Sequence, residues 1–120
     1  MMDSKELILG KWSLFKSNGN ETGVADEIYA KNGTKESLTS IYKMSNEPEK
    51  ISVLSSWRIE KNILVEKITS IDKKTSKMVG VKKGFELRSF IIELSTDVLK
   101  LKPLNTKHGE EATYYRSVSS

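Results

Sequence analysis

The chain has 120 residues, the size of one domain, and residues 1–120 are expected to form a single unit with its own core. It contains no cysteine and one histidine, so disulfides, thiolate nucleophiles and metal sites built from several cysteines or histidines are excluded. The net charge is +4, but only three of the basic residues are arginine and the lysines mostly alternate with apolar positions, so no nucleic-acid partner is expected.

The sequence carries no signal for a membrane span. No apolar run reaches the roughly 18 to 20 residues that a spanning helix needs, so a transmembrane protein is not expected. The first six residues are polar and acidic, unlike the basic start and apolar run of a signal peptide. Two locations stay open: the cytoplasm, or export after removal of a signal peptide.

Only the first ten residues predict a helix. Asp3 is placed to cap its start, with Glu6 completing a capping box, and Gly10 is placed to end it. The predicted helix has one or two turns.

From Lys11 onward, apolar and polar residues alternate with a period of two, which is typical of β-strands. Asn32-Gly33 predicts a hairpin with a type I′ turn, in which both central residues need a positive φ, and residues 46–49 predict another turn. Residues 49–57 also fit a helix, but their β-branched and serine content favours a strand. The predicted strands are 11–17, 26–32, 34–43, 51–60, 63–71, 77–82 and 85–94 (two strands, or one long strand), 98–104 and 112–117.

The segment that runs to residue 94 is apolar on both faces, and a bulge near Gly84 or Ser89 would reconcile them. The whole pattern predicts an all-β fold of eight or nine antiparallel strands joined by short turns. Such a chain hides its strand edges by closing into a barrel or by forming a sandwich.

Five short motifs resemble those of the small bacterial lipocalin-like domains of the lipocalin/calycin superfamily. They are Gly10-Lys11-Trp12, Tyr29-Ala30-Lys31-Asn32-Gly33-Thr34, Trp57-Arg58-Ile59 with Leu64, the hairpin of residues 94–101, and Tyr114-Tyr115-Arg116. The resemblance implies an eight- or nine-stranded up-and-down antiparallel β-barrel with a short N-terminal helix. It also implies a non-enzymatic protein that binds an apolar or amphipathic molecule, in some cases a carboxylate-bearing one.

The resemblance implies a structural seal at one end of this barrel. Trp12 is expected to cross the closed end, with the guanidinium of Arg116 stacked on it within about 6 Å of the ring centroid. Arg116 also shares a strand face with Tyr114, so the alternative is that Arg116 binds a ligand carboxylate in the lumen.

The candidate ligand-binding residues are aromatic and charged side chains on the strands, expected around a cavity of about 300 Å³ or more. Glu66 and Arg88 are further expected to pair inside the barrel. The lumen candidates are Tyr29, Tyr42, Trp57, Glu66, Arg88, Phe90 and Tyr114.

The alternative function is a protein-interaction module with a filled barrel and no small-molecule ligand. No catalytic residue, cofactor or metal is expected, because no acid–base pair stands out and His108 lies alone in a loop. The expected state is a monomer or a weak dimer.

Overall fold

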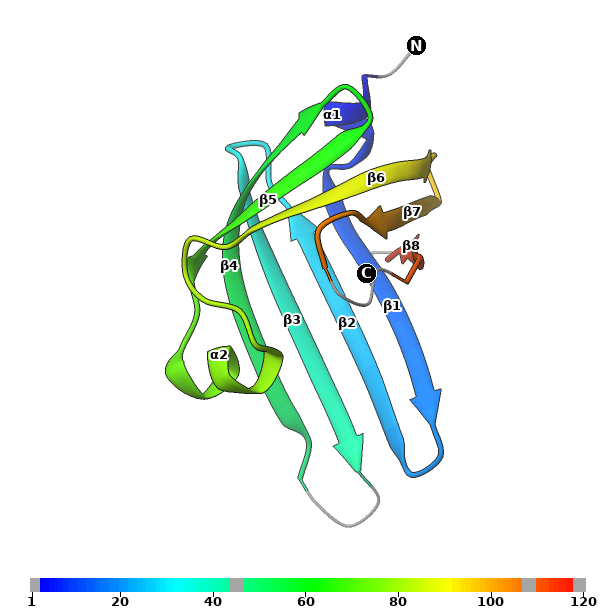
Figure 1. Cartoon of the computed structure of the whole chain (residues 1–120). Coiled ribbons are helices and arrows are strands. Elements are labelled where there is room, and N and C mark those ends of the chain that lie inside the picture. The colour runs from blue at the N-terminus through cyan, green and yellow to red at the C-terminus, as the bar shows by residue number, and fades with distance from the viewer. Residues whose placement is uncertain (1–2, 44–46, 107–109, 118–120) are drawn as a thin grey trace.

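The computed structural model describes residues 3–43, 47–106 and 110–117. In this part of the chain it shows a closed antiparallel barrel with one helix before the first strand and one between the fifth and sixth (Figure 1). No helix among these residues has the length and apolar character to cross a membrane. The elements are α1 (Ser4–Leu7), β1 (Gly10–Asn18), β2 (Glu21–Tyr29), β3 (Thr34–Lys43), β4 (Glu49–Glu60), β5 (Ile63–Ser70), α2 (Lys73–Val79), β6 (Glu86–Leu94), β7 (Val98–Pro103) and β8 (Ala112–Arg116).

The strands follow one another around the barrel in chain order. Each pairs with the next, and β1 pairs with β8 to close the ring. The expected eight-stranded up-and-down barrel is confirmed, and so is strand, rather than helix, for residues 49–57. Closure leaves no continuous open sheet edge.

The strand predicted over residues 77–82 is wrong, because this segment belongs to α2 and the turn after it. The Asp72 carboxylate accepts a 2.7 Å hydrogen bond from the backbone N–H of Thr75, which caps the start of the helix. Gly80, with a φ of 75°, ends it in the left-handed conformation.

The Asn32-Gly33 hairpin is present, but its turn is not of type I′. Of these two residues only Gly33 has a positive φ, at 87°. The Asn32 side chain instead accepts a 3.1 Å hydrogen bond from the backbone N–H of Thr34, as in an Asx turn. The turn predicted at residues 46–49 begins at Asn46, which lies outside the described residues.

The predicted bulge near Gly84 or Ser89 is also misplaced. The register between β6 and β7 shifts between Ile91 and Glu93. Because of this shift Leu94 returns to the face of its partner Leu99, which is fully buried.

The hydrophobic core lies at the end of the barrel that α1 covers. Trp12 is fully buried there, and its indole Nε1 donates a 2.8 Å hydrogen bond to the carbonyl of Ile8. The core residues are Ile8, Trp12, Tyr29, Leu64, Leu99 and Leu101. The hydrophobic core therefore closes this end of the barrel.

Candidate functional site

The inner face of the barrel can be followed from strand to strand, because directly paired residues of adjacent antiparallel strands point to the same side. Trp12 of β1 pairs with Glu27 of β2, and Glu27 pairs with Ser37 of β3. Two residues further along β2, Tyr29 pairs with Lys35. All of these side chains therefore point into the barrel.

A hydrogen bond across the interior confirms this orientation. The Tyr29 hydroxyl donates to Oε2 of Glu66 at 2.9 Å. Tyr29 lies on β2 and Glu66 on β5, and these strands are not neighbours in the sheet. The bond therefore spans the lumen rather than the sheet surface.

Lys35 lies between two carboxylates in this interior. Its ammonium forms an ion pair with Oε2 of Glu66 and another with Oε2 of Glu27, at 3.3 Å in the second case. The Ser37 hydroxyl also donates to Oε2 of Glu27. The side chains of Lys35, Glu27 and Glu66 are only 10%, 12% and 5% exposed, so the cluster is largely withdrawn from water.

The pKa of Lys35 reflects a competition between burial and charge. Burial alone lowers the pKa of the ammonium, but Glu66, Tyr29 and Glu27 together raise it by more, so the pKa lies well above its ordinary value. Lys35 is therefore a permanent cation at physiological pH.

The two interior tyrosines are held neutral. Burial raises the pKa of Tyr29, and the carboxylate of Glu66 raises it further. Burial likewise raises the pKa of Tyr114, with Glu27 adding to the effect. Both phenols therefore keep their hydroxyl protons at neutral pH.

An aromatic pair stands beside this cluster. The rings of Tyr29 and Trp57 meet edge to face, with centroids 5.7 Å apart. The Trp57 indole donates a 3.0 Å hydrogen bond to the carbonyl of Ala30, and the Lys35 ammonium lies 5.2 Å from the centroid of the Tyr29 ring. These contacts fix the side chains that surround the charged groups.

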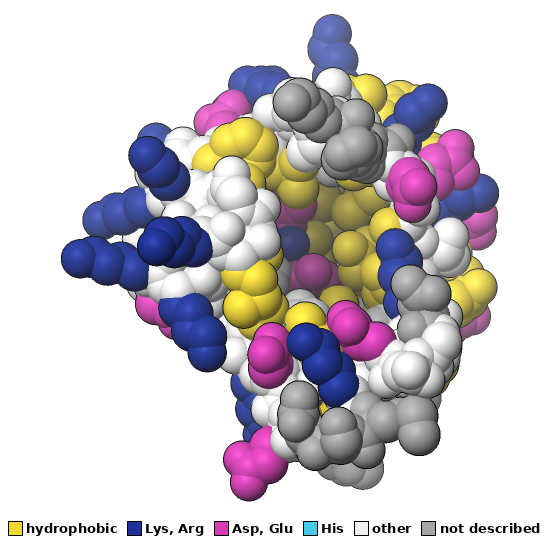
Figure 2. Space-filling view, turned by 60° about the horizontal axis from the view of Figure 1, so that its bottom comes forward, with side chains coloured by type: hydrophobic (Ala, Val, Ile, Leu, Met, Phe, Trp, Pro, Cys, Tyr) yellow, Lys and Arg dark blue, Asp and Glu magenta, His cyan; other side chains and the backbone are white. Residues whose placement is uncertain are grey.

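The barrel is hollow at the end opposite α1. Figure 2 shows this end, where hydrophobic and charged side chains border a depression with acidic and basic side chains at its bottom. Gly23 lies on the inner face of β2, between Lys16 of β1 and Ile41 of β3, and a Cβ at Gly23 would meet no atom within 4 Å. The lumen is thus open around Gly23, and the buried charged cluster lies deeper.

The opposite, closed end contains the expected contact between Trp12 and Arg116. The guanidinium carbon of Arg116 lies 4.1 Å from the centroid of the Trp12 ring, within the distance expected for a cation–π pair. Its Nη1 also donates to the carbonyl of Leu9 at 2.7 Å, and its Nη2 donates to that of Leu7. Arg116 thus binds the segment that leads from α1 into β1.

No protein-family model matches the chain, and no curated protein matches it either. Among solved structures, the barrel is similar to a lipocalin-like protein from Bacteroides uniformis ATCC 8492, with a TM-score of 0.62 over 92% of this chain and 99% of the other. The fold is lipocalin-like. Because the two sequences are 12% identical, the similarity is one of architecture.

Four of the seven lumen candidates lie on the inner face of the lipocalin-like barrel, namely Tyr29, Trp57, Glu66 and Tyr114. Tyr114 is placed there by its pairing with the buried Leu99. The structure brings Tyr29, Trp57 and Glu66 together around Lys35.

The other three candidates, Tyr42, Arg88 and Phe90, lie on the outer face. Tyr42 follows the inward-facing Ile41, is paired with Thr22 and is 46% exposed. Arg88 and Phe90 flank the inward-facing Ser89, and Phe90 is 40% exposed. Their strands carry apolar residues on both faces, so the alternation did not reveal which face is buried.

The expected pair of Glu66 with Arg88 is wrong. Arg88 forms a 2.8 Å ion pair with Glu86 on the outer surface, whereas Glu66 pairs with Lys35. Sequence reasoning missed Lys35, Glu27 and Ser37 altogether. The hairpin around Gly33 held a usable signal, since it places Lys35 directly opposite Tyr29.

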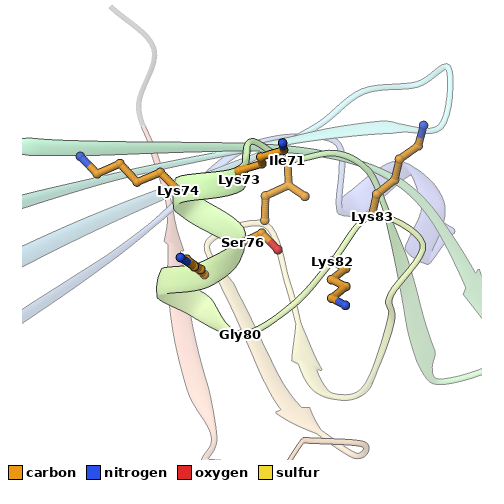
Figure 3. Close-up of a pocket in the computed structure, with 8 residues that line it drawn as sticks. Ile71, Lys73, Lys74, Ser76, Gly80, Lys82 and Lys83 are labelled. Carbon is orange, nitrogen blue, oxygen red and sulfur yellow. The ribbon is translucent and has the colours of Figure 1, made fainter.

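Outside the barrel, α2 and the residues after it line a second pocket of about 800 Å³ (Figure 3). Five lysines border it, but the side chains of Lys74, Lys82 and Lys83 point away from one another. They form a diffuse basic surface and not a convergent anion site. The lining residues are Ile71, Lys73, Lys74, Ser76, Lys77, Gly80, Lys82 and Lys83.

His108, expected to lie alone in a loop with no site role, is outside the described residues. In the described ranges, no three acidic, histidine or cysteine side chains gather as a metal site would require.

Proposed function

We propose that this lipocalin-like barrel is a non-enzymatic binding protein for a small apolar or amphipathic molecule. The ligand enters at the end opposite α1, with its apolar part along the hollow and its polar end at the cluster of Glu27, Lys35 and Glu66. The observation that carries the proposal is the hollow itself, which is partly lined by hydrophobic side chains and ends on buried charged groups (Figure 2).

The buried cluster supports binding better than it supports folding. Removing charged side chains from water costs several kcal/mol per ion, and well-packed hydrophobic residues are often equally stabilising. Here the charged groups lie beside the core of Trp12, Tyr29 and Leu64. The buried charged groups are therefore better explained as partners for the polar end of a ligand than as a contribution to core packing.

The residues proposed to contact the ligand combine the inward-facing sequence candidates with the charged residues found in the structure. Trp57 and Tyr29 supply aromatic surface, and Tyr114 supplies a second phenol from β8. The proposed set is Glu27, Tyr29, Lys35, Trp57, Glu66 and Tyr114.

A neutral apolar dye such as Nile red tests the proposal. The dye should bind with about one-to-one stoichiometry and gain fluorescence in the apolar lumen. Gly23→Leu fills the hollow, because no atom lies within 4 Å of a Cβ there, and should weaken binding at least about tenfold.

Ser40→Leu is the matched control. Ser40 pairs with Val24 on the outer face of the same two strands, so a leucine at this position adds similar bulk outside the lumen. This variant should bind the dye like the parent protein. Equal binding by the parent and Gly23→Leu would contradict the proposal and favour a protein-interaction module.

A further inference from the structure

The charged groups at the bottom of the lumen do not balance. One ammonium, that of Lys35, faces two carboxylates, those of Glu27 and Glu66. The tyrosines that interact with them, Tyr29 and Tyr114, stay neutral because burial raises the pKa of each. The bottom of the lumen thus carries one net negative charge.

Lys35 is not free to neutralise an incoming anion. Its ammonium is already paired with both carboxylates, and the ring of Tyr29 lies 5.2 Å away on another side. A ligand carboxylate would have to share this ammonium with both glutamates or displace one of them, and in either case it would lie beside a carboxylate. Like charges so close together, out of water, repel strongly.

The carboxylates themselves retain acceptor capacity. Every hydrogen bond and ion pair that the described residues make to Glu27 and Glu66 runs to Oε2. Each Oε1 atom therefore keeps lone pairs that can accept hydrogen bonds from a ligand.

Lys16 and Lys43 also lie on the inner face, but near the open end, opposite Gly23 and Glu21. At the closed end Arg116 is held by backbone carbonyls. Nε of Arg116 donates to the carbonyl of Thr96 at 2.6 Å, and its two terminal nitrogens donate to Leu9 and Leu7. Three of the five N–H donors of Arg116 are therefore used at the closed end, which favours the seal over binding of a carboxylate in the lumen.

We infer that the lumen selects amphiphiles whose polar end is a hydrogen-bond donor or a cation, such as a primary amine or an alcohol, over those that end in a carboxylate. This inference rests on the proposed function. The donor end would bind the Oε1 atoms of Glu27 and Glu66, and an ammonium would also offset the net negative charge.

Three ligands with the same ten-carbon chain but different polar end groups test this preference. Decylamine, decanol and decanoate are titrated by calorimetry at pH 7.5, below their micellar concentrations. Decylamine should bind at least about tenfold more tightly than decanoate, with decanol between them. Decanoate binding equal to or tighter than decylamine, or no binding of any of the three while Nile red binds, overturns the inference and leaves the proposed function standing.

If neither Nile red nor any of the three ligands binds, the proposed function fails and the inference with it. If they bind, Glu27→Gln tests the charge directly, because it makes the bottom of the lumen neutral while the Lys35–Glu66 pair remains. The preference for decylamine over decanoate should fall about tenfold.

Glu36→Gln removes the same charge from the outer face of β3, where Glu36 pairs with Ile28, and should leave the preference unchanged. An unchanged preference in folded Glu27→Gln contradicts the inference. Should Glu27→Gln not fold, Glu66→Gln makes the same change in charge and should lower the preference equally.

Discussion

Arg116 and Trp12 face each other directly across the seam between β1 and β8, and the guanidinium carbon lies 4.1 Å from the centroid of the indole. The same guanidinium donates to carbonyls of Leu7, Leu9 and Thr96. Thr96 belongs to the turn between β6 and β7. One side chain on the last strand therefore connects both chain ends and a neighbouring turn.

Arg116→Ala should destabilise the fold by about 2–4 kcal/mol, because it removes a cation–π contact and three charge-assisted hydrogen bonds. Urea unfolding followed by tryptophan fluorescence measures the loss. Nile red affinity of the folded variant should be unchanged, since Arg116 lies at the closed end. The control Arg58→Ala removes an exposed arginine, paired with Glu60 on the surface, and should barely shift the unfolding midpoint. A stable Arg116→Ala variant that no longer binds the dye would contradict the role as a seal.

Gly10→Ala should cost about 1–3 kcal/mol for two reasons. Gly10 has a φ of 111°, which side chains rarely adopt, and a Cβ there would lie 2.9 Å from Nη1 of Arg116. Combined with Arg116→Ala, the loss should be smaller than the sum of the two single losses, because the close contact is gone. Gly23→Ala, at a position with open space, should show no loss in the same urea unfolding experiment. Strict additivity of the two changes would indicate that backbone strain alone makes Gly10 necessary.

The alternating segments predicted a barrel or a sandwich that hides the strand edges, and the resemblance to lipocalin-like domains favoured the up-and-down barrel and its seal. Such a closure brings the first and last strands together, so Trp12 and Arg116 meet. The helix α2 was missed, although Asp72 at its start is a residue type that caps helices. Asp3, expected to cap α1, makes no side-chain capping bond.

The lumen residues were less predictable than the fold, because the face of a strand that points inward is known only when the pairing register is known. Ile41 and Tyr42 are adjacent and both apolar, and a shift of one residue exchanges the inner and outer faces. On β6 the shift between Ile91 and Glu93 gives both faces apolar residues. The partners of Lys35 come from two other strands, so no local sequence pattern predicts its ion pairs.

Folding stability should fall at alkaline pH. The pKa values of Lys35, Tyr29 and Tyr114 are all raised in the folded state, so each group holds its proton more tightly there than in the unfolded chain. Above about pH 10 the unfolded chain loses these protons first, and unfolding becomes easier by up to about 1.4 kcal/mol per pH unit for each group. Urea unfolding between pH 8 and about 11 should therefore show a plateau and then a steep decline.

Tyr114→Phe isolates one of these groups. Without this phenol, the folded and unfolded states differ by one bound proton fewer above about pH 10. The decline in folding stability with pH should therefore be less steep by about 1.4 kcal/mol per pH unit. The same slope in Tyr114→Phe and in the parent protein would show that this phenol ionises as easily in the barrel as in the unfolded chain.

Lys35→Met should be among the most damaging single substitutions in the barrel, at about 3–5 kcal/mol at pH 7. It leaves the carboxylates of Glu27 and Glu66, only 12% and 5% exposed, without their shared cation. The double variant Lys35→Met/Glu66→Gln carries one buried charge fewer and should regain much of the stability at pH 7, which keeps the test usable even if the single variant does not fold. Urea midpoints at pH 7 measure both effects. A Lys35→Met loss that Glu66→Gln does not relieve would mean that Lys35 contributes through the packing of its aliphatic stem and not through its charge.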